Sequence, residues 1–513
     1  MNFPRPKHRA TGPPPRQYNL APVRPVEQAV EYPHPHVNGT VAALVGLALT
    51  ALLSNGELPS TVARGAAIGS LLSIGVSMAF DFQISGLRNL IRADLMAILA
   101  FYFLTLFEFL FPQPNFNTLI SVQTTHYSLL TVELGFAGLF IGRHFLHPKK
   151  QPFQHTLTYE IPAAWTVVIF WACFFIGYFH MLLAVDFNVF EMCAWFLDPR
   201  FTQPWQRGKF GDWKALLVEL GLFIYLIPPL AGIMIARRHR YGAIALIFVF
   251  GGLLFTFWYG FTSGTRNVFA SYLVTFLIAY SFALPFAKQK ELVILCVTCA
   301  VVMVVATYAM LQFRSVGLRN YWNGDYEPPP PGEKTMFVDY NLYAICRLVE
   351  VFPNQQNYLG WEIPYQALIR PIPRAIWAGK PEGLSSSIED ALGAEEGVTI
   401  SASFVGEAYM SGGVSVVLII ALIFGALTGW WSHLASPKNS ELGILIYASG
   451  FFATVISMRS IFVFTTALLP TVAALVIGTY AVSILSRHAR GLLARVANRT
   501  RAPRRPPPAP VRR

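Results

Sequence analysis

The feature that most constrains the fold is a series of long apolar segments that recurs from about residue 38 to about residue 486. A bilayer core about 30 Å thick is crossed by roughly 20 apolar residues of α-helix. Because backbone groups must stay paired in hydrocarbon, such segments are expected to be helical. The composition agrees, since 54% of the residues are hydrophobic and only 13% are charged. The sequence therefore predicts an all-α polytopic integral membrane protein.

The apolar segments predict about twelve transmembrane helices, nine before a long polar stretch and three after it. The expected spans run near 38–54, 61–80, 93–112, 128–146, 160–184, 213–236, 241–260, 267–286, 290–310, 413–432, 440–457 and 461–485. The chain is thereby divided into a tail (1–37), nine helices (38–310), a large loop that contains short helices (311–412), three helices (413–486) and a second tail (487–513).

Basic residues predict the orientation of these helices, because Lys and Arg concentrate in cytoplasmic connections. The first tail contains Arg5, Lys7, Arg9, Arg16 and Arg24, and residues 487–513 contain nine arginines and no acid. Both tails are therefore expected to be cytoplasmic, Pro-rich and disordered, near anionic lipid headgroups. Nucleic-acid binding is the rival interpretation of these tails. We expect no nucleic-acid partner, because the net charge of +12 mostly reflects topology.

The large loop, predicted to lie on the opposite face, contains seven cations and twelve acids, so its cations are exceptions to the local charge. Apolar residues spaced by three and four over 338–352 predict an amphipathic helix that lies on the membrane or caps the bundle. Prolines at 364, 371, 373 and 381 predict irregular backbone around Arg370, Arg374 and Lys380. Irregular backbone at a membrane is expected to be buried in protein or to line a wet cavity.

Two further external cations stand at helix ends, Arg266 in Ser-Gly-Thr-Arg and Arg459 in Ser-Met-Arg-Ser. Ionisable groups near membrane depth usually need a partner. Snorkelling to lipid headgroups is one explanation, and convergence with Arg370 and Arg374 on one anionic ligand is the other. Arginine's planar fork is suited to a diphosphate.

The motif order then resembles a known family. An external Ser-Gly-Thr-Arg ending at Arg266 is followed by Ile-Pro-Arg-x-Ile-Trp-x-x-Lys-Pro from Ile372 to Pro381, by Gly-Glu-x-Tyr-x-x-x-Gly from Gly406 to Gly413, and by Arg459. This order is similar to that of the Wzy-type O-antigen or oligosaccharide repeat-unit polymerases, over roughly residues 266–459.

The resemblance implies an inverting, metal-independent glycosyltransferase of the membrane-embedded GT-C type, without a cofactor, at the outer face of the bacterial inner membrane. An undecaprenyl-diphosphate-linked glycan would be the donor and a lipid-linked repeat unit the acceptor, with chain-length regulator and flippase partners. The large loop would then be periplasmic.

The expected reaction needs cations for the diphosphate and a carboxylate for the hydroxyl proton. Glu407 is the first choice for this carboxylate and Asp339 the second. A salt bridge to an arginine or a helix-start position is the alternative role of Glu407. The expected catalytic residues are Arg266, Arg374, Arg459 and Glu407, and the expected substrate-binding residues are Arg314, Arg319, Arg370, Lys380, Trp377 and Asp339.

Three alternatives stay open: an O-antigen ligase or another GT-C transferase, a lipid-linked oligosaccharide flippase or other transporter, and a purely structural membrane protein. A transporter should carry charges along its helix interiors. Here Glu133 and Glu219 are the notable exceptions in nearly charge-free spans.

No metal-ligand spacing is evident, and Cys296 and Cys299 lie in an apolar span where they are expected to pack in the core.

Overall fold

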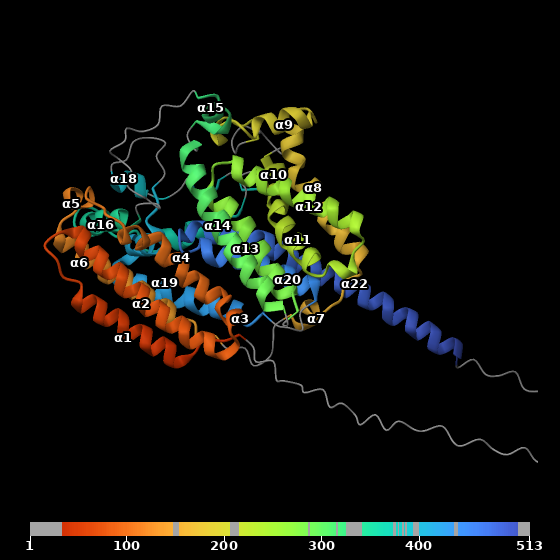
Figure 1. Cartoon of the computed structure of the whole chain (residues 1–513), viewed down its shortest axis with the longest axis horizontal. Coiled ribbons are helices and arrows are strands. Elements are labelled where there is room, and N and C mark those ends of the chain that lie inside the picture. The colour runs from red at the N-terminus through yellow and green to blue at the C-terminus, as the bar shows by residue number, and fades with distance from the viewer. Residues whose placement is uncertain are drawn as a thin grey trace, which may run out of the picture. The chain divides into compact units, whose positions relative to one another are not determined.

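The structure is a computed structural model. It describes residues 33–146, 153–205, 215–285, 288–313, 316–324, 341–372, 376–377, 379–381, 384, 387–392, 400–435 and 440–500. These residues form helices and contain no strand, which confirms the all-α class for the described part of the chain (Figure 1).

The longer helices correspond in order to the predicted spans, with α16 added from the large loop. They are α1 (Val37–Leu53), α2 (Pro59–Ser85), α4 (Ala93–Thr105), α6 (Val122–Gly142), α8 (Ala163–Ala184), α11 (Ile227–Ala236), α12 (Ala243–Thr262), α13 (Arg266–Ala283), α14 (Gln289–Phe313), α16 (Asn341–Val351), α19 (Ser403–Ser432), α20 (Glu441–Ile456) and α22 (Leu469–Thr500).

Short helices and 3-10 turns connect them. They are α3 (Leu87–Leu90), η1 (Phe107–Leu110), α5 (Phe116–Leu119), α7 (Gln154–Leu157), α9 (Val189–Trp195), η2 (Arg200–Thr202), α10 (Ala215–Val218), η4 (Glu219–Leu226), η5 (Arg238–Arg240), α15 (Gly317–Asn323), α17 (Glu362–Ile369), α18 (Ile388–Leu392) and α21 (Ile461–Ala467).

Seven helical segments of the described chain are long and apolar enough to cross a membrane. They are Pro59–Ile84, Ala163–Ala184, Glu219–Ala236, Ala243–Thr262, Lys290–Met310, Ser403–Ser432 and Ile461–Ile484. Helices α1, α4 and α20 are apolar but shorter. Helix α4, for example, has 13 residues and rises about 20 Å, less than the roughly 30 Å of a bilayer core. The other five of the twelve expected spans stay a prediction.

Apolar side chains on the outer faces of these helices are suited to a lipid environment. On α14, Ile294 is 66% exposed and Val304 is 64% exposed, and on α1, Leu52 is 73% exposed. Rows of exposed aliphatic residues of this kind would be costly in water. The chain is therefore a membrane protein.

The helices enclose two main apolar cores. One lies among α2, α4, α6, α16 and α19, with Phe101, Phe136 and Phe404 fully buried. The other lies among α8, α11, α12, α13 and α20. Helix α19 packs against α6 and α4, and α20 also packs against α4, so these helices join the two cores. In Figure 1, α1, α2 and α6 run side by side, with α5 and α16 at one end of this group.

Glycines bring α6 and α19 into close contact. Gly138 and Gly142 on α6 are four residues apart, as are Gly425 and Gly429 on α19. A Cβ atom on Gly425 would lie 2.6 Å from the carbonyl oxygen of Leu139 and 3.0 Å from the Cα atom of Gly142. Small residues at such spacing allow membrane helices to approach with backbone contact. This contact holds α19, whose first turns contribute to the candidate site.

Gly425→Ala should therefore destabilise the protein by about 1–3 kcal/mol, because the methyl group meets backbone that cannot move aside. Thermal unfolding in detergent measures the change. Gly251→Ala is the matched control, since Gly251 lies inside α12 and a Cβ atom there meets nothing within 4 Å. That control should be neutral or stabilising by up to about 1 kcal/mol. Equal behaviour of the two variants would contradict the close packing of α6 and α19.

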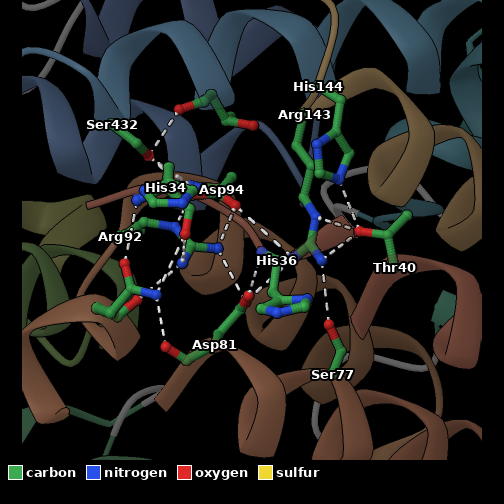
Figure 2. Close-up of polar contacts among 12 residues, drawn as sticks. His34, His36, Thr40, Ser77, Asp81, Arg92, Asp94, Arg143, His144 and Ser432 are labelled. Atoms are coloured by element: carbon green, nitrogen blue, oxygen red, sulfur yellow. Dashed lines mark hydrogen bonds and ion pairs between the residues drawn. The ribbon is translucent and has the colours of Figure 1, made fainter. Parts of the chain in front are cut away.

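A buried ionic cluster joins the ends of α2, α4 and α6 (Figure 2). Arg92 contacts Asp81 and Asp94, each with a nitrogen-to-oxygen distance of 2.9 Å. Arg143 lies 3.4 Å from Asp81 and 3.8 Å from Asp94. These four side chains are at most 1% exposed. Burial alone would lower the pKa of Arg92, but attraction and hydrogen bonds from Asp94 and Asp81 outweigh it and raise that pKa above its ordinary value.

Hydroxyl groups extend the cluster to two further helices. Ser432, the last residue of α19, donates a 2.8 Å hydrogen bond to Asp94. Thr40 on α1 accepts one from Arg143 Nε at 3.1 Å, and Ser77 on α2 accepts another at 3.1 Å. By position, Arg92 and Arg143 resemble ordinary loop cations, since Arg92 directly precedes α4 and Arg143 directly follows α6. They do lie in connections, but both are fully buried.

Helix α19 begins at Ser403 rather than near 413, and it contains a break. The backbone leaves helical geometry at Gly412 and Gly413, where Gly413 has a φ of 70°. A Cβ atom on Gly413 would also lie 2.8 Å from the hydroxyl oxygen of Tyr358. Glycine permits this left-handed conformation without strain. The break separates the first turns of α19, which contain Glu407, from the longer apolar part.

The amphipathic helix expected over 338–352 is present as α16, and the structure describes it from Asn341. Leu342, Ile345 and Leu348 are fully buried, and the helix packs on α6 and α19. Of the two predicted placements, α16 therefore caps the bundle. On this helix Arg347 pairs with Glu350 at 2.5 Å.

Candidate functional site

A cavity of about 590 Å³ lies among α17, α18, the start of α19 and the junction between α20 and α21. Its walls come from segments almost a hundred residues apart in the chain. The residues that line it are Gln366, Arg370, Lys380, Pro381, Leu384, Ser387, Ile388, Glu389, Ile400, Ser401, Glu407, Arg459, Ser460, Phe462 and Val463.

Arg370 follows the last residue of α17 and is fixed from two sides. Pro364 falls in the first turn of α17, where proline is tolerated, and the helix ends at Ile369. The guanidinium carbon of Arg370 lies 5.7 Å from the centre of the Phe462 ring, a cation–π contact. Thr465 on α21 donates a 2.6 Å hydrogen bond to the carbonyl oxygen of Ala367. Helix α21 therefore orients the end of α17 that presents Arg370.

Lys380 joins the end of the irregular segment 370–381 to the start of that segment by hydrogen bonds. Its Nζ atom donates hydrogen bonds to the carbonyl oxygens of Arg370, at 3.1 Å, and Ile372, at 2.9 Å. The described residues between 370 and 381 form turns and no helix, as the prolines predicted. The ammonium group thus lies beside the backbone of Arg370, and two cations are brought to one wall of the cavity.

Glu407 is 3% exposed and lies on the first turns of α19. One carboxylate oxygen accepts a 2.6 Å hydrogen bond from Ser460 Oγ, and the other accepts a 2.5 Å hydrogen bond from the backbone nitrogen of Ile461. Arg370 and Arg459 both attract this carboxylate. Glu407 therefore holds the junction of α20 and α21 and compensates part of the positive charge around it.

Arg459 follows α20 and is tied to the start of α19 through the backbone. Its carbonyl oxygen accepts a 3.2 Å hydrogen bond from Ser401 Oγ. The carbonyl oxygen of the preceding residue, Met458, accepts one from the backbone nitrogen of Phe404, also at 3.2 Å. These contacts fix the α20–α21 junction in register with α19.

The lining contains three cations and two carboxylates, which gives it a formal charge of plus one. The three cations are Arg370, Lys380 and Arg459, and the carboxylates are Glu389 and Glu407. Guanidinium and ammonium groups that line one cavity are typical of a site for an anion with several oxygens, such as a phosphate. Among the described residues no group of three or more His, Cys, Asp or Glu side chains could hold a metal ion.

The carboxyl-terminal part of the chain matches one family model. Residues 333–482 match the family described as Domain of unknown function (DUF8712). No curated protein and no solved structure matches the chain. The matched range includes every residue that lines the cavity. The cavity therefore lies within the part of the chain that matches this family model.

Four of the ten expected site residues lie together at this cavity: Arg370, Lys380, Arg459 and Glu407. Three others, Arg314, Asp339 and Arg374, lie outside the described residues. Arg370 and Arg459 thus line one cavity, and the convergence of the expected arginines on one anionic ligand stays a prediction.

The other three expected residues are described but do not line the cavity. Arg319 pairs with Asp198 at 3.3 Å and donates a 2.8 Å hydrogen bond to the carbonyl oxygen of Ala194. Arg266 is the first residue of α13, and Trp377 is about one third exposed in the irregular segment. Their expected roles stay predictions.

Sequence reasoning missed several lining residues, of which Glu389, Ser460 and Phe462 matter most. Glu389 stands in α18, in a Ser-rich and acid-rich stretch that offered no motif. Ser460 directly follows Arg459, so the motif containing Arg459 could have suggested it. Phe462 looked like an ordinary apolar residue at the start of a span. Its contact with Arg370 depends on the packing of α17 against α21, which no local pattern encodes.

Proposed function

We propose that this chain is a glycosyltransferase that joins lipid-diphosphate-linked oligosaccharide repeat units at a membrane surface. The observation that carries the proposal is the convergence of Arg370, Lys380 and Arg459 on one cavity of a membrane protein. A diphosphate is a polyanion whose leaving-group charge such cations stabilise. The motif order described above supports the same substrate class.

In this proposal Arg370 and Arg459 bind the diphosphate of an undecaprenyl-linked donor, with Lys380 beside them. The acceptor sugar hydroxyl forms a bond to the anomeric carbon of the donor sugar. The bond from that carbon to the diphosphate oxygen breaks, and the electron pair leaves with the diphosphate. The configuration at the anomeric carbon inverts, because attack occurs opposite the leaving group.

The hydroxyl proton passes to a carboxylate of the cavity, and the two carboxylates differ in their hydrogen bonds. Both oxygens of Glu407 accept hydrogen bonds, from Ser460 and Ile461. Among the described residues, Glu389 accepts one, from the backbone nitrogen of Ile400 at 3.2 Å. Hydrogen bonds to a carboxylate stabilise its charged form and weaken it as a proton acceptor. The proposal therefore gives Glu389 the proton and gives Glu407 the role of a positioning residue.

The proposal includes the finer architecture expected from the sequence. The chain is a GT-C-like protein of about twelve spans in a bacterial inner membrane, with both tails cytoplasmic and the cavity on the periplasmic side. Chain-length regulator and flippase proteins are its proposed partners.

Purified protein incubated with authentic undecaprenyl-diphosphate-linked repeat units should produce a ladder of longer lipid-linked glycans, resolved on a gel. A ligase would instead transfer one glycan to a different acceptor without a ladder, and a flippase would move the lipid across a vesicle bilayer without new glycosidic bonds. Absence of a ladder with several authentic substrates would sink the polymerase proposal.

A further inference from the structure

A second cavity, of about 350 Å³, lies between the end of α1 and the first turns of α6. The residues that line it are Ala51, Ser54, Gln123, His126, Tyr127, Leu129, Leu130 and Glu133. It shares no lining residue with the first cavity, called here the cationic cavity because Arg370, Lys380 and Arg459 line it. The second cavity has no Lys or Arg in its lining, and its one acidic residue is Glu133.

One wall of this cavity is formed by the carboxyl group of Glu133, which has no counterion among the described residues. Glu133 is 5% exposed, and its Oε2 atom is buried with no hydrogen-bond partner among the described residues. Glu133 lies eleven residues after the first residue of α6, which corresponds to about 16 Å along the helix. A carboxyl group at such depth is ionised only when a cation lies beside it, because an unpaired buried charge is costly. No Lys or Arg among the described residues forms an ion pair with Glu133.

The mouth of the cavity has the features of a cation entrance. Gln123 and Tyr127 are exposed, and His126 is partly buried on the same face of α6. Tyr127 is 44% exposed, so it stands at the surface, where an aromatic ring can attract a cation. Positions 123, 126, 127, 130 and 133 follow helical spacing, so one stripe of α6 leads from the mouth to Glu133.

We propose that this second cavity binds a primary ammonium group, with Glu133 as its counterion and Tyr127 at the entrance. An ammonium group fits because it supplies both the missing positive charge and the hydrogen-bond donors that the buried oxygen lacks. The group could be delivered by a soluble amine or by an aminophospholipid headgroup, and the apolar residues Leu129 and Leu130 suit the carbon atoms of either.

The test compares ammonium ligands with methylated controls that keep the charge but lack N–H donors. In the soluble arm, full-length protein in detergent is heated with ethanolamine or with choline at equal ionic strength. In the lipid arm, the protein is reconstituted with phosphatidylethanolamine or with phosphatidylcholine. At saturation, ethanolamine or phosphatidylethanolamine should raise the unfolding midpoint by roughly 2 °C or more over its methylated control. The arm that responds identifies the source of the ammonium group.

Glu133→Gln should abolish this difference, because the amide keeps the shape and removes the charge. Ala51→Phe is a second variant that leaves Glu133 intact and fills the cavity from α1, where Ala51 is exposed, and it should also remove the response. It keeps the test decisive if Glu133→Gln does not fold. Equal responses to ammonium and methylated ligands in both arms, or full retention of the response in the variants, would overturn the proposal.

Discussion

Arg459→Ala should reduce the proposed glycan elongation by about 10²–10³-fold, because in that reaction one charged donor to the leaving diphosphate is lost. Arg459 lines the cationic cavity together with Arg370 and Lys380. Its backbone contacts with Ser401, and those of Met458 with Phe404, do not involve the guanidinium group. The fold should therefore survive the substitution. The measurement is the rate of ladder formation by purified protein, with the amount of membrane-inserted protein determined in parallel.

Two variants make this result specific. Arg459→Lys keeps the charge but loses the planar fork, and it should retain activity between that of Arg459→Ala and that of the wild type. Arg347→Ala removes an arginine that pairs with Glu350 on α16, outside the cationic cavity, and its rate should stay within about twofold of wild type. Full elongation by Arg459→Ala would remove the diphosphate role of this residue.

Asp94→Ala should lower the free energy of unfolding by about 3–5 kcal/mol, because it leaves a buried arginine without one of its counterions. Arg92 makes two hydrogen bonds of 2.9 Å to the Asp94 carboxylate, and both side chains are at most 1% exposed. Loss of Asp94 also removes the 2.8 Å hydrogen bond that joins the end of α19 to α4. Unfolding in detergent, followed by temperature or denaturant, measures the effect.

A surface pair provides the matched control for this prediction. Glu160 is 69% exposed and pairs with Arg240 at 3.2 Å, so Glu160→Ala should cost less than about 1 kcal/mol. The double variant Arg92→Met with Asp94→Leu should be much less damaging than Asp94→Ala, because it leaves the Arg143–Asp81 pair neutral. If Asp94→Ala were no more harmful than Glu160→Ala, the ionic cluster would have no structural role.

The helices were predictable because each apolar segment must form its own backbone hydrogen bonds in lipid. The buried stripe of α16, with Leu342, Ile345 and Leu348, was predictable for a similar reason, since its spacing has the period of a helix. The irregular backbone after Arg370 followed from its prolines. Each of these features depends on local sequence.

The features that could not be predicted depend on packing between distant segments. Arg92 and Arg143 follow the pattern of cytoplasmic loop cations, and only the contact of α2, α4 and α6 pairs them with Asp81 and Asp94. The hydrogen bonds of Glu407 likewise require α21 to begin beside α19. The side chains of the ionic cluster have hydrogen-bond partners in one another and in the backbone of residues such as His34 and Asn89, which is typical of a structural clamp more than of a transport path.

Equilibrium binding of farnesyl diphosphate to the purified full-length chain tests the proposal that the cationic cavity binds a lipid diphosphate. Wild-type protein should bind the diphosphate more tightly than farnesyl monophosphate, because the second phosphate engages a further cation. Arg370→Ala should raise the Kd for the diphosphate by at least about tenfold, the loss expected for one charge-assisted hydrogen bond. Equal Kd values for wild type and Arg370→Ala would contradict the account.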